Sequence, residues 1–341
     1  MNNFEVLAER AGVVFMGMDA AQLQYQTREI IAEMGLDAQS LPQTTANSGI
    51  LSLFTTYVDP KMIDILVTPM RAAEIAGNER KLGDWVTETT AFPVVESTGF
   101  TAAYGDFNTN GRSGVNVNWP QRQSFHYQTM TEWGERELER AAKARIDWAN
   151  RQNIASVLTL NKYQNKTYFF GVAGLQNYGL LNDPALPASI GPTTGVGGNT
   201  WPQKTSLEIL ADFTALYQDL QGRAKGLVEL DTPMTCALSP LREVFLTKTT
   251  DFNVTVADRL KKMFPNLTIK VAPEYTTGSG ELMQLFPNEI EGQLTLECSF
   301  TEKLRSHPLI TAESSFRQKK SQGTWGTVIY RPFLVSSMLG F

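Results

Sequence analysis

The sequence is poor in the side chains that most often build catalytic and metal centres. Its 341 residues include only two cysteines and two histidines. His126 lies between two aromatic residues and His307 directly precedes a proline, and neither has cysteine, histidine or carboxylate neighbours at the spacing of metal ligands. Cys236 and Cys298 are far apart in the chain, so two reduced, buried thiols are favoured over a disulfide. We therefore expect no metal site.

Motifs of nucleotide-binding and hydrolytic enzymes are missing as well. The nearest match to a phosphate-binding loop, residues 191–198, lacks the Lys-Ser/Thr ending and follows no clear strand. No G-x-S-x-G occurs, and the carboxylates of Glu289 and Glu291 fit a solvated turn better than an acid–base pair. The sequence thus predicts no catalytic residue and no cofactor. An α/β enzyme whose site has no recognisable motif is the alternative.

Charge and hydropathy argue against two further classes of protein. The net charge is −5, whereas a protein that grips nucleic-acid phosphates as its main task needs a dense basic face. No apolar run approaches the roughly 18 residues that a membrane-spanning helix needs. The first ten residues have no basic stretch leading into an apolar one. We expect neither a membrane partner nor a secretory signal.

Residues 1–55 predict an arm with little core of its own. Within them, residues 20–34 place four apolar side chains on one helical face, directly before Gly35. Residues 37–49 are rich in Gln, Thr, Ser, Asn and Pro, which is typical of an extended segment. A helix is then expected to begin at Pro60.

Residues 84–128 predict a long β-hairpin. A run rich in Thr, Val and aromatic residues precedes the turn-rich residues 105–114, and period-two alternation follows. We expect the tip near Asn108–Gly114 and arms of about 15 residues, reaching about 50 Å. Two strands cannot cover so much apolar surface, so a neighbouring subunit is the natural partner and folding back on the same chain is the alternative. The residues expected at the contact are Phe100, Tyr104, Phe107, Arg112, Trp119, Arg122 and Phe125.

A long amphipathic helix is predicted from Met130 to about Ala155, and beyond if it continues to Tyr163. Thr129 and Glu132 have the spacing of a capping box at its start. At 1.5 Å per residue the helix would be about 39 Å long. Its apolar stripe is narrow and rich in alanine, which suits close packing against a sheet. The residues expected in that stripe are Leu138, Ala141, Ala142, Ile146 and Ala149.

Strand and helix patterns alternate through the rest of the chain. After a loop at residues 185–203, an amphipathic helix is expected over Leu207–Leu220, capped by Thr205 or Ser206. A strand-like pattern returns from Ser314, and we expect it to pair back near the long helix. Further strands are predicted at residues 234–239, 267–273, 281–286 and 293–300, and short helices at 241–246 and 256–264.

This order of elements resembles the major capsid proteins of tailed bacteriophages, whose fold encapsulin shells share. The local likeness lies in residues 135–150, in the G-L-L-N-D-P at the end of residues 169–184, and in W-G-T-V-I-Y-R-P-F-L at residues 325–334. The resemblance implies an α+β fold with the parts found in that family. These are an N-terminal arm (1–55), an extended E-loop hairpin (84–128), a peripheral P-domain with a long spine helix (56–83, 129–184 and 306–341) and an axial A-domain (185–305).

The resemblance also implies a function. It indicates a non-enzymatic coat protein that assembles through pentamers and hexamers into an icosahedral shell around double-stranded DNA. The implied partners are other copies of the chain, a portal, a scaffold, an optional decoration protein, and DNA held by non-specific contact. The implied location is the virion, after assembly in the cytoplasm of the bacterial host. An encapsulin-like nanocompartment shell is the alternative within the same fold.

Covalent cross-links between subunits are not expected. Some capsids of the family join neighbours by a Lys–Asn isopeptide bond whose lysine lies in the E-loop. Residues 84–128 contain no lysine, and the guanidinium groups of Arg112 and Arg122 stay protonated and cannot replace an amine nucleophile. Lys81 lies at the base of the hairpin, far from its tip. We predict that shells boiled in SDS run as single chains near 37.9 kDa, and covalent oligomers that survive reducing agent would contradict this.

Overall fold

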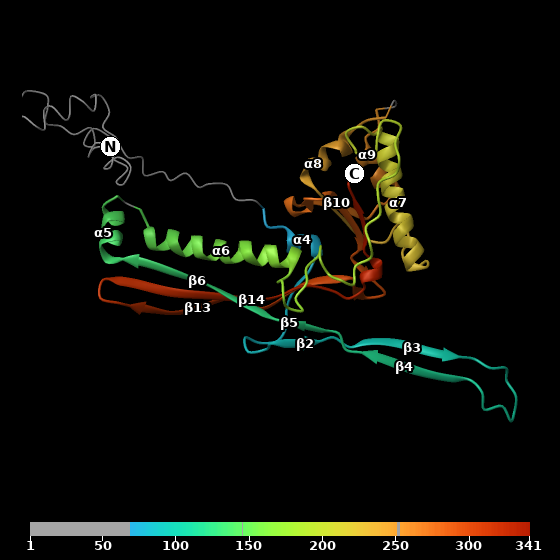
Figure 1. Cartoon of the computed structure of the whole chain (residues 1–341), viewed down its shortest axis with the longest axis horizontal. Coiled ribbons are helices and arrows are strands. Elements are labelled where there is room, and N and C mark those ends of the chain that lie inside the picture. The colour runs from blue at the N-terminus through green and yellow to red at the C-terminus, as the bar shows by residue number, and fades with distance from the viewer. Residues whose placement is uncertain (1–68, 145, 251–252) are drawn as a thin grey trace, which may run out of the picture. The chain divides into compact units, whose positions relative to one another are not determined.

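The computed structural model describes residues 69–144, 146–250 and 253–341, and Figure 1 shows their arrangement. The predicted N-terminal arm (1–55), the helix at residues 20–34 and the start of the helix at Pro60 lie outside the described residues. Among the residues that are described, no helix is long and apolar enough to cross a membrane. Two β-sheets form the framework of this part of the chain, and each has its own helices.

The first sheet has four strands in the order β1-β13-β14-β6. Its bounds are β1 (Glu79–Lys81), β6 (Phe125–Gly134), β13 (Leu296–Thr311) and β14 (Ser315–Ile329). β1 runs parallel to β13, and the other neighbours are antiparallel. The helices α4 (Ala72–Ala76) and α6 (Trp148–Phe170) pack on this sheet, α6 along β14 and β6. The strand expected to return to the long helix is therefore confirmed as β14.

The second sheet has the order β15-β10-β7-β8, with β9 paired to β10. Its strands are β7 (Met234–Leu238), β8 (Leu267–Val271), β9 (Thr276–Thr277), β10 (Gly280–Pro287) and β15 (Ser336–Leu339). The helices of this unit are α7 (Ser206–Ala224), α8 (Pro240–Glu243), η1 (Val244–Thr247) and α9 (Val256–Met263). The predicted helix after Thr205 is confirmed, and Thr205 and Glu208 form its capping box. A cluster of buried side chains, including Phe213 and Met283, forms its core.

The two sheets do not divide the chain at the predicted position. The expected boundary between residues 305 and 306 falls inside β13, which continues in one sheet to Thr311. The chain also ends in the second sheet, because β15 pairs with β10 and the buried Phe341 ring lies 4.6 Å from that of Trp201. Short elements complete the described fold: η2 (Pro273–Tyr275), η3 (Pro332–Leu334), β11 (Glu289–Ile290) and β12 (Gln293–Leu294).

The tryptophan and glycine of the W-G-T-V stretch both have a structural role. Trp325 is fully buried, and its indole N–H donates to the backbone oxygen of Leu82 at 3.0 Å. Gly326 has φ +73°, and a Cβ there would clash with the backbone oxygen of Tyr178. Only glycine fits, because β14 and the connection after α6 approach at backbone distance. The resemblance noted in the sequence thus rests on residues that the packing requires.

The predicted helix over Met130–Ala155 is wrong in two respects: its first residues form a strand, and the rest is divided between two helices. Residues up to Gly134 belong to β6, which pairs with β14 along its whole length. Burial alternates along these residues, because Thr131 and Trp133 are buried and Met130 is exposed. A repeat of two residues is that of a strand and not of a helix. The predicted capping box therefore does not form, and Glu132 instead pairs with Arg317 of β14 at 2.9 Å.

Two separate helices follow β6 in place of one. The first, α5 (Glu135–Lys143), begins where the Glu137 carboxylate accepts from the backbone N–H of Gly134 at 3.4 Å. The second, α6, begins after Asp147, whose side chain accepts from the backbone N–H of Asn150 at 3.3 Å. Asp147 is the N-cap of α6: its side chain accepts from a backbone N–H that would bond within the helix if α5 and α6 were continuous. This cap fixes the start of α6.

The predicted buried stripe is also wrong. Ala142 is exposed, and Leu138, Ala141, Ile146 and Ala149 are only half-buried. The buried face lies further along, on α6. Its members are Ser156, Leu160, Gln164, Asn165, Thr167, Tyr168 and Phe169. Most of these side chains are polar, which is why hydrophobic periodicity did not locate the face.

Aspartate substitutions test which residues are buried, those of the observed face on α6 or those of the predicted stripe. Leu160 is 2% exposed, so we expect Leu160→Asp to cost more than about 4 kcal/mol and to prevent soluble folding. Ala142→Asp is the matched control at an exposed position, and we expect it to cost about 0.5 kcal/mol through helix propensity. Soluble yield and urea unfolding measure both. A folded Leu160→Asp variant, or an insoluble Ala142→Asp variant, would mean that the buried face is misplaced.

Candidate assembly surface

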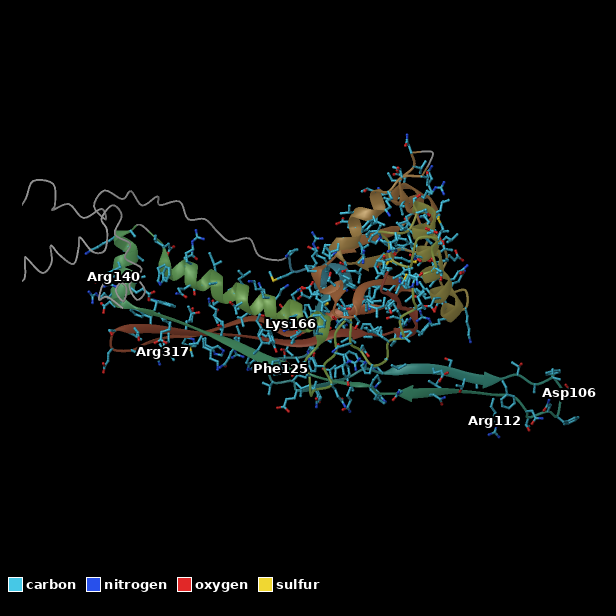
Figure 2. The ribbon with its side chains drawn as sticks, turned by 45° about the horizontal axis from the view of Figure 1, so that its top comes forward. Asp106, Arg112, Phe125, Arg140, Lys166 and Arg317 are labelled. Carbon is cyan, nitrogen blue, oxygen red and sulfur yellow. The ribbon has the colours of Figure 1, made fainter. Side chains whose placement is uncertain are left out.

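A two-stranded ribbon provides the most exposed apolar surface among the described elements. β3 (Val94–Phe100) pairs antiparallel with β4 (Arg112–Asn118), and residues 101–111 connect them. All 14 strand residues are exposed. The predicted hairpin is confirmed, but its tip begins earlier than Asn108, and Arg112–Gly114 belong to β4. Figure 2 shows Asp106 and Arg112 at the far end of the ribbon.

The paired strands of the hairpin are shorter than the predicted arms, because the hydrogen-bonded ladder between them is interrupted at one point in each strand. Closer to the first sheet, β2 (Thr89–Ala91) pairs with β5 (Gln121–Gln123). Pro93 and Pro120 lie between the two ladders, and proline has no backbone N–H to donate. The Phe92 N–H donates to the Pro120 oxygen at 3.0 Å across this gap. The hairpin therefore consists of a base, β2–β5, and a distal ribbon, β3–β4.

The base is anchored within its own chain. An Arg122 guanidinium nitrogen lies 2.7 Å from a carboxylate oxygen of Asp183, whose side chain is 1% exposed. The same guanidinium lies 4.7 Å from the ring centre of Tyr178, which permits a cation–π contact. The Phe92 ring packs edge-on against Tyr330 at 5.8 Å. These contacts fix where the distal ribbon starts.

The connecting loop presents two aromatic rings to solvent. Tyr104 is 94% exposed and Phe107 is 100% exposed. The loop is held by its own polar contacts, because the Asn108 side chain donates to the oxygen of Ala103 at 2.7 Å and accepts from the N–H of Asn110 at 2.9 Å. The rings are therefore displayed on an internally hydrogen-bonded loop, which lowers the entropy lost on contact with a partner.

The structure separates the predicted contact residues into two groups. Phe100, Tyr104, Phe107, Arg112 and Trp119 are exposed. Arg122 and Phe125 are engaged within the same chain. Phe125 belongs to β6, and its ring packs against Tyr127 and Tyr163 at 6.4 and 6.3 Å. These two side chains support the base of the hairpin and do not extend the exposed surface.

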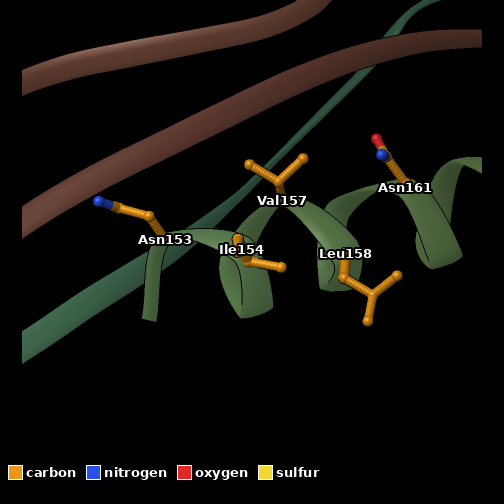
Figure 3. Close-up of a pocket in the computed structure, with 5 residues that line it drawn as sticks. All are labelled: Asn153, Ile154, Val157, Leu158 and Asn161. Atoms are coloured by element: carbon orange, nitrogen blue, oxygen red, sulfur yellow. The ribbon is translucent and has the colours of Figure 1, made fainter. Parts of the chain in front are cut away.

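A groove along α6 is a second candidate contact surface. It is lined by Asn153, Ile154, Val157, Leu158 and Asn161 and has a volume of about 350 Å³ (Figure 3). Its lining contains no titratable side chain. Lys320 approaches Asn153 from β14, with Nζ 2.8 Å from Oδ1, and burial lowers the pKa of this lysine. The groove can contribute apolar contact, but it lacks the groups that acid–base chemistry needs.

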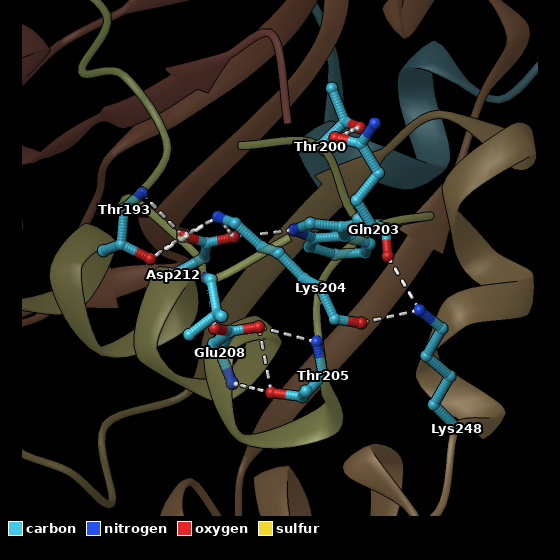
Figure 4. A network of polar contacts seen from close by, with 10 residues as sticks. Thr193, Thr200, Gln203, Lys204, Thr205, Glu208, Asp212 and Lys248 are labelled. Carbon is cyan, nitrogen blue, oxygen red and sulfur yellow. Dashed lines mark hydrogen bonds and ion pairs between the residues drawn. The ribbon is translucent and has the colours of Figure 1, made fainter. Parts of the chain in front are cut away.

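The region of the glycine-rich loop contains a buried ion pair that sequence reasoning missed. Lys204 Nζ lies 2.7 and 2.5 Å from the two carboxylate oxygens of Asp212, and both side chains are fully buried (Figure 4). Asp212 also accepts from the backbone N–H of Thr193 at 2.8 Å and from the indole N–H of Trp201 at 2.9 Å. Lys204 is thus committed to Asp212. The arrangement holds residues 193–204 against α7, which fits a structural loop better than a phosphate site.

The histidines and cysteines also have structural surroundings. His126 Nε2 lies 3.2 Å from Thr301 Oγ1, and His307 Nε2 lies 2.8 Å from Ser321 Oγ. Cys236 and Cys298 are free and buried, as predicted, and burial raises the pKa of each thiol to about 12. Over the part of the chain that the structure describes, no three His, Cys, Asp or Glu side chains are placed to hold a metal ion.

Comparison with known proteins gives a family-model match and many structural matches. The model described as Pa193 gp26 major capsid protein matches residues 41–340. The capsid of Myoviridae phage XM1 is similar at TM-score 0.73 and 13% identity, over 87% of this chain and 100% of that one. The capsid of cyanophage P-SCSP1u has TM-score 0.55 and 9% identity, over 89% and 99%. Gordonia phage Cozz has TM-score 0.55 and 9% identity, over 89% and 98%. No curated protein matches the sequence.

Loss of the arginine at the base should destabilise the folded chain. Arg122→Gln leaves the Asp183 carboxylate buried without its ion-pair partner, so we expect the free energy of unfolding to fall by about 3 kcal/mol. Arg112→Gln is the control, because Arg112 is exposed and has no ion-pair partner among the described residues, and we expect a change within about 0.5 kcal/mol. Urea unfolding of both variants measures the difference. Equal effects would show that the Arg122 pair does not anchor the base.

Proposed function

The chain belongs to the Pa193 gp26 major capsid protein family, and from that premise we propose that its distal ribbon joins neighbouring copies in the shell. A phage major capsid protein is a structural protein of the virion, and it associates with copies of itself to form an icosahedral capsid. The observation that carries the proposal is the ribbon β3–β4 with its loop. It exposes aromatic and aliphatic side chains that nothing in the described part of the chain covers.

The proposal assigns the parts of the chain to roles in the shell. Residues 84–128, with the base and the distal ribbon, serve as the E-loop that overlaps a neighbour. The four-stranded sheet with α5 and α6 serves as the P-domain, and the second sheet with α7 to α9 as the A-domain at the axes of pentamers and hexamers. Two features support these assignments: each sheet has its own helices, and the distal ribbon is uncovered. Residues 1–55 are proposed as the N-terminal arm.

The energetics of one ribbon contact are modest. Burying an aromatic side chain such as Tyr104 or Phe107 is worth about 2 kcal/mol or more, less the cost of ordering both surfaces. Such a contact is weak between two free subunits. In a closed shell every copy makes and receives it, so the sum stabilises the particle while single contacts stay reversible. This fits a subunit that must correct errors during assembly.

The proposal extends to the other components of a virion. It includes a portal, a scaffold, an optional decoration protein, and double-stranded DNA held by non-specific contact after assembly in the bacterial cytoplasm. It includes no catalytic residue, because the histidines, thiols and buried carboxylate–lysine pair are all engaged in packing. The family match favours a virion capsid over the nanocompartment shell and the α/β enzyme.

Removing the two exposed rings of the loop should block assembly without unfolding the subunit. We expect the double variant Tyr104→Ser and Phe107→Ser to have the circular dichroism of the unaltered chain, since neither ring is buried. Its yield of shells, by light scattering and negative-stain microscopy, should fall severely. Ile310→Ser is the control, because Ile310 is 61% exposed and lies on β13, outside residues 84–128. Normal shells from the double variant would contradict the proposed role of the ribbon.

A further inference from the structure

The two faces of the distal ribbon differ in chemistry. In an antiparallel pair, residues directly opposite each other point to the same side, and successive residues alternate. The observed register runs from Val94 opposite Asn118 to Phe100 opposite Arg112. One side, which we call the valine face, consists of Val95, Ser97, Gly99, Ser113, Val115 and Val117. The other, the charged face, consists of Val94, Glu96, Thr98, Phe100, Arg112, Gly114, Asn116 and Asn118.

The valine face is uncharged, and its side chains are all small. Val95 and Val117 are directly opposite each other, and Val115 is opposite Ser97. The three valines are 61%, 49% and 61% exposed, in the order Val95, Val117, Val115. At the distal end of this face Gly99 has no side chain that projects from the surface. A Cβ at this position would lie 3.0 Å from the backbone oxygen of Arg112. The result is a flat apolar strip with no charge and no amide group, which suits close contact with another protein surface.

No described residue of the same chain covers this strip. The base of the hairpin is held by the Arg122–Asp183 pair and by Phe92 against Tyr330, so the distal ribbon starts from a fixed position. A two-stranded ribbon without a covered face is only marginally stable in water. A partner that covers the valine face would therefore stabilise the ribbon as well as bind it.

The size of the strip indicates the kind of partner. Seven residue pairs at about 3.3 Å per residue, in two strands that each occupy about 4.8 Å of width, give a face of roughly 220 Å². A stable pair of proteins buries about 800 Å² on each side. The strip is thus too small to hold a separate partner by itself. It is sufficient when the same contact recurs by symmetry in an assembly of identical copies.

We infer that the valine face docks on an uncharged apolar surface of a second copy of this chain, while the charged face remains in solvent. This rests on the proposed function and specifies which side of the ribbon makes the contact. The other face also exposes Phe100 and Val94, at 63% and 48%, but burying it would desolvate the charges of Glu96 and Arg112, which are exposed and form no ion pair with another described residue.

The test compares one aspartate substitution on each face of the ribbon. Val115→Asp and Thr98→Asp each replace an exposed β-branched residue by aspartate, opposite Ser97 and Gly114 respectively. Both should fold with the thermal midpoint of the unaltered chain. We expect the yield of shells to fall by about tenfold or more for Val115→Asp, because its carboxylate would be desolvated in each contact, and to stay within about twofold for Thr98→Asp. Equal yields, or a loss with Thr98→Asp alone, would overturn the inference.

Cysteine labelling gives a second readout that does not depend on assembly yield. The Val115→Cys and Thr98→Cys variants, incubated with a maleimide, should both react in free subunits, whereas Cys236 and Cys298 are buried. In shells made of this chain alone, we expect protection of the first variant and continued reaction of the second. Equal labelling in shells, or protection that requires another protein, would overturn the inference. Failure of the unaltered chain to form any shell, with or without the scaffold, would instead count against the proposed function.

Discussion

The hydrogen-bonded contact between α6 and β14 is the interaction on which the rest of the first sheet depends. Lys320 Nζ donates to Ser156 Oγ at 2.7 Å, and the Gln322 amide donates to the Asn161 side chain at 3.0 Å. Thr327 Oγ1 donates to the Tyr168 backbone oxygen at 2.8 Å. Each such group would cost about 1–3 kcal/mol if it were buried without a partner. The position of the helix along the strand is therefore set by matched donors and acceptors, which only one register satisfies.

That register also determines where the hairpin begins. β14 pairs with β6 from Ser315 to Thr324, and β6 follows directly after the base of the hairpin. The connection after α6 ties the same region together, because the Asn177 amide donates to the oxygens of Gln123 and Thr324 at 3.0 and 3.1 Å. Helix, sheet and hairpin base are thus one hydrogen-bonded unit. The distal ribbon beyond Pro93 and Pro120 has no part in this unit, and its strand residues are all exposed in the described part of the chain.

The second sheet uses a different means to fix a loop. Asp212 is fully buried and receives donors from Lys204, Thr193 and Trp201. A buried ion pair gains little over apolar packing, because desolvation offsets much of the attraction, but removing one partner is costly. Its effect here is to hold residues 193–204 in one position on α7. The Lys248 ammonium adds to this by donating to the backbone oxygens of Trp201 and Lys204 at 2.8 and 2.7 Å.

The sequence by itself determined the elements whose signals are local. The helix after Thr205, the strands β7, β8 and β10 of the second sheet and the existence of the hairpin follow from caps, periodicity and turn residues, which act between near neighbours in the chain. Tertiary structure decided the rest. Residues 129–134 have helix-like spacing but form a strand, because β14, about 190 residues later, supplies their hydrogen bonds. Arg122 and Phe125 face their own chain because Asp183 and Tyr163 are placed beside them only by the fold. The buried face of α6 is largely polar. Its side chains are held by hydrogen-bond partners on distant segments, so the spacing of apolar residues in the sequence does not reveal it.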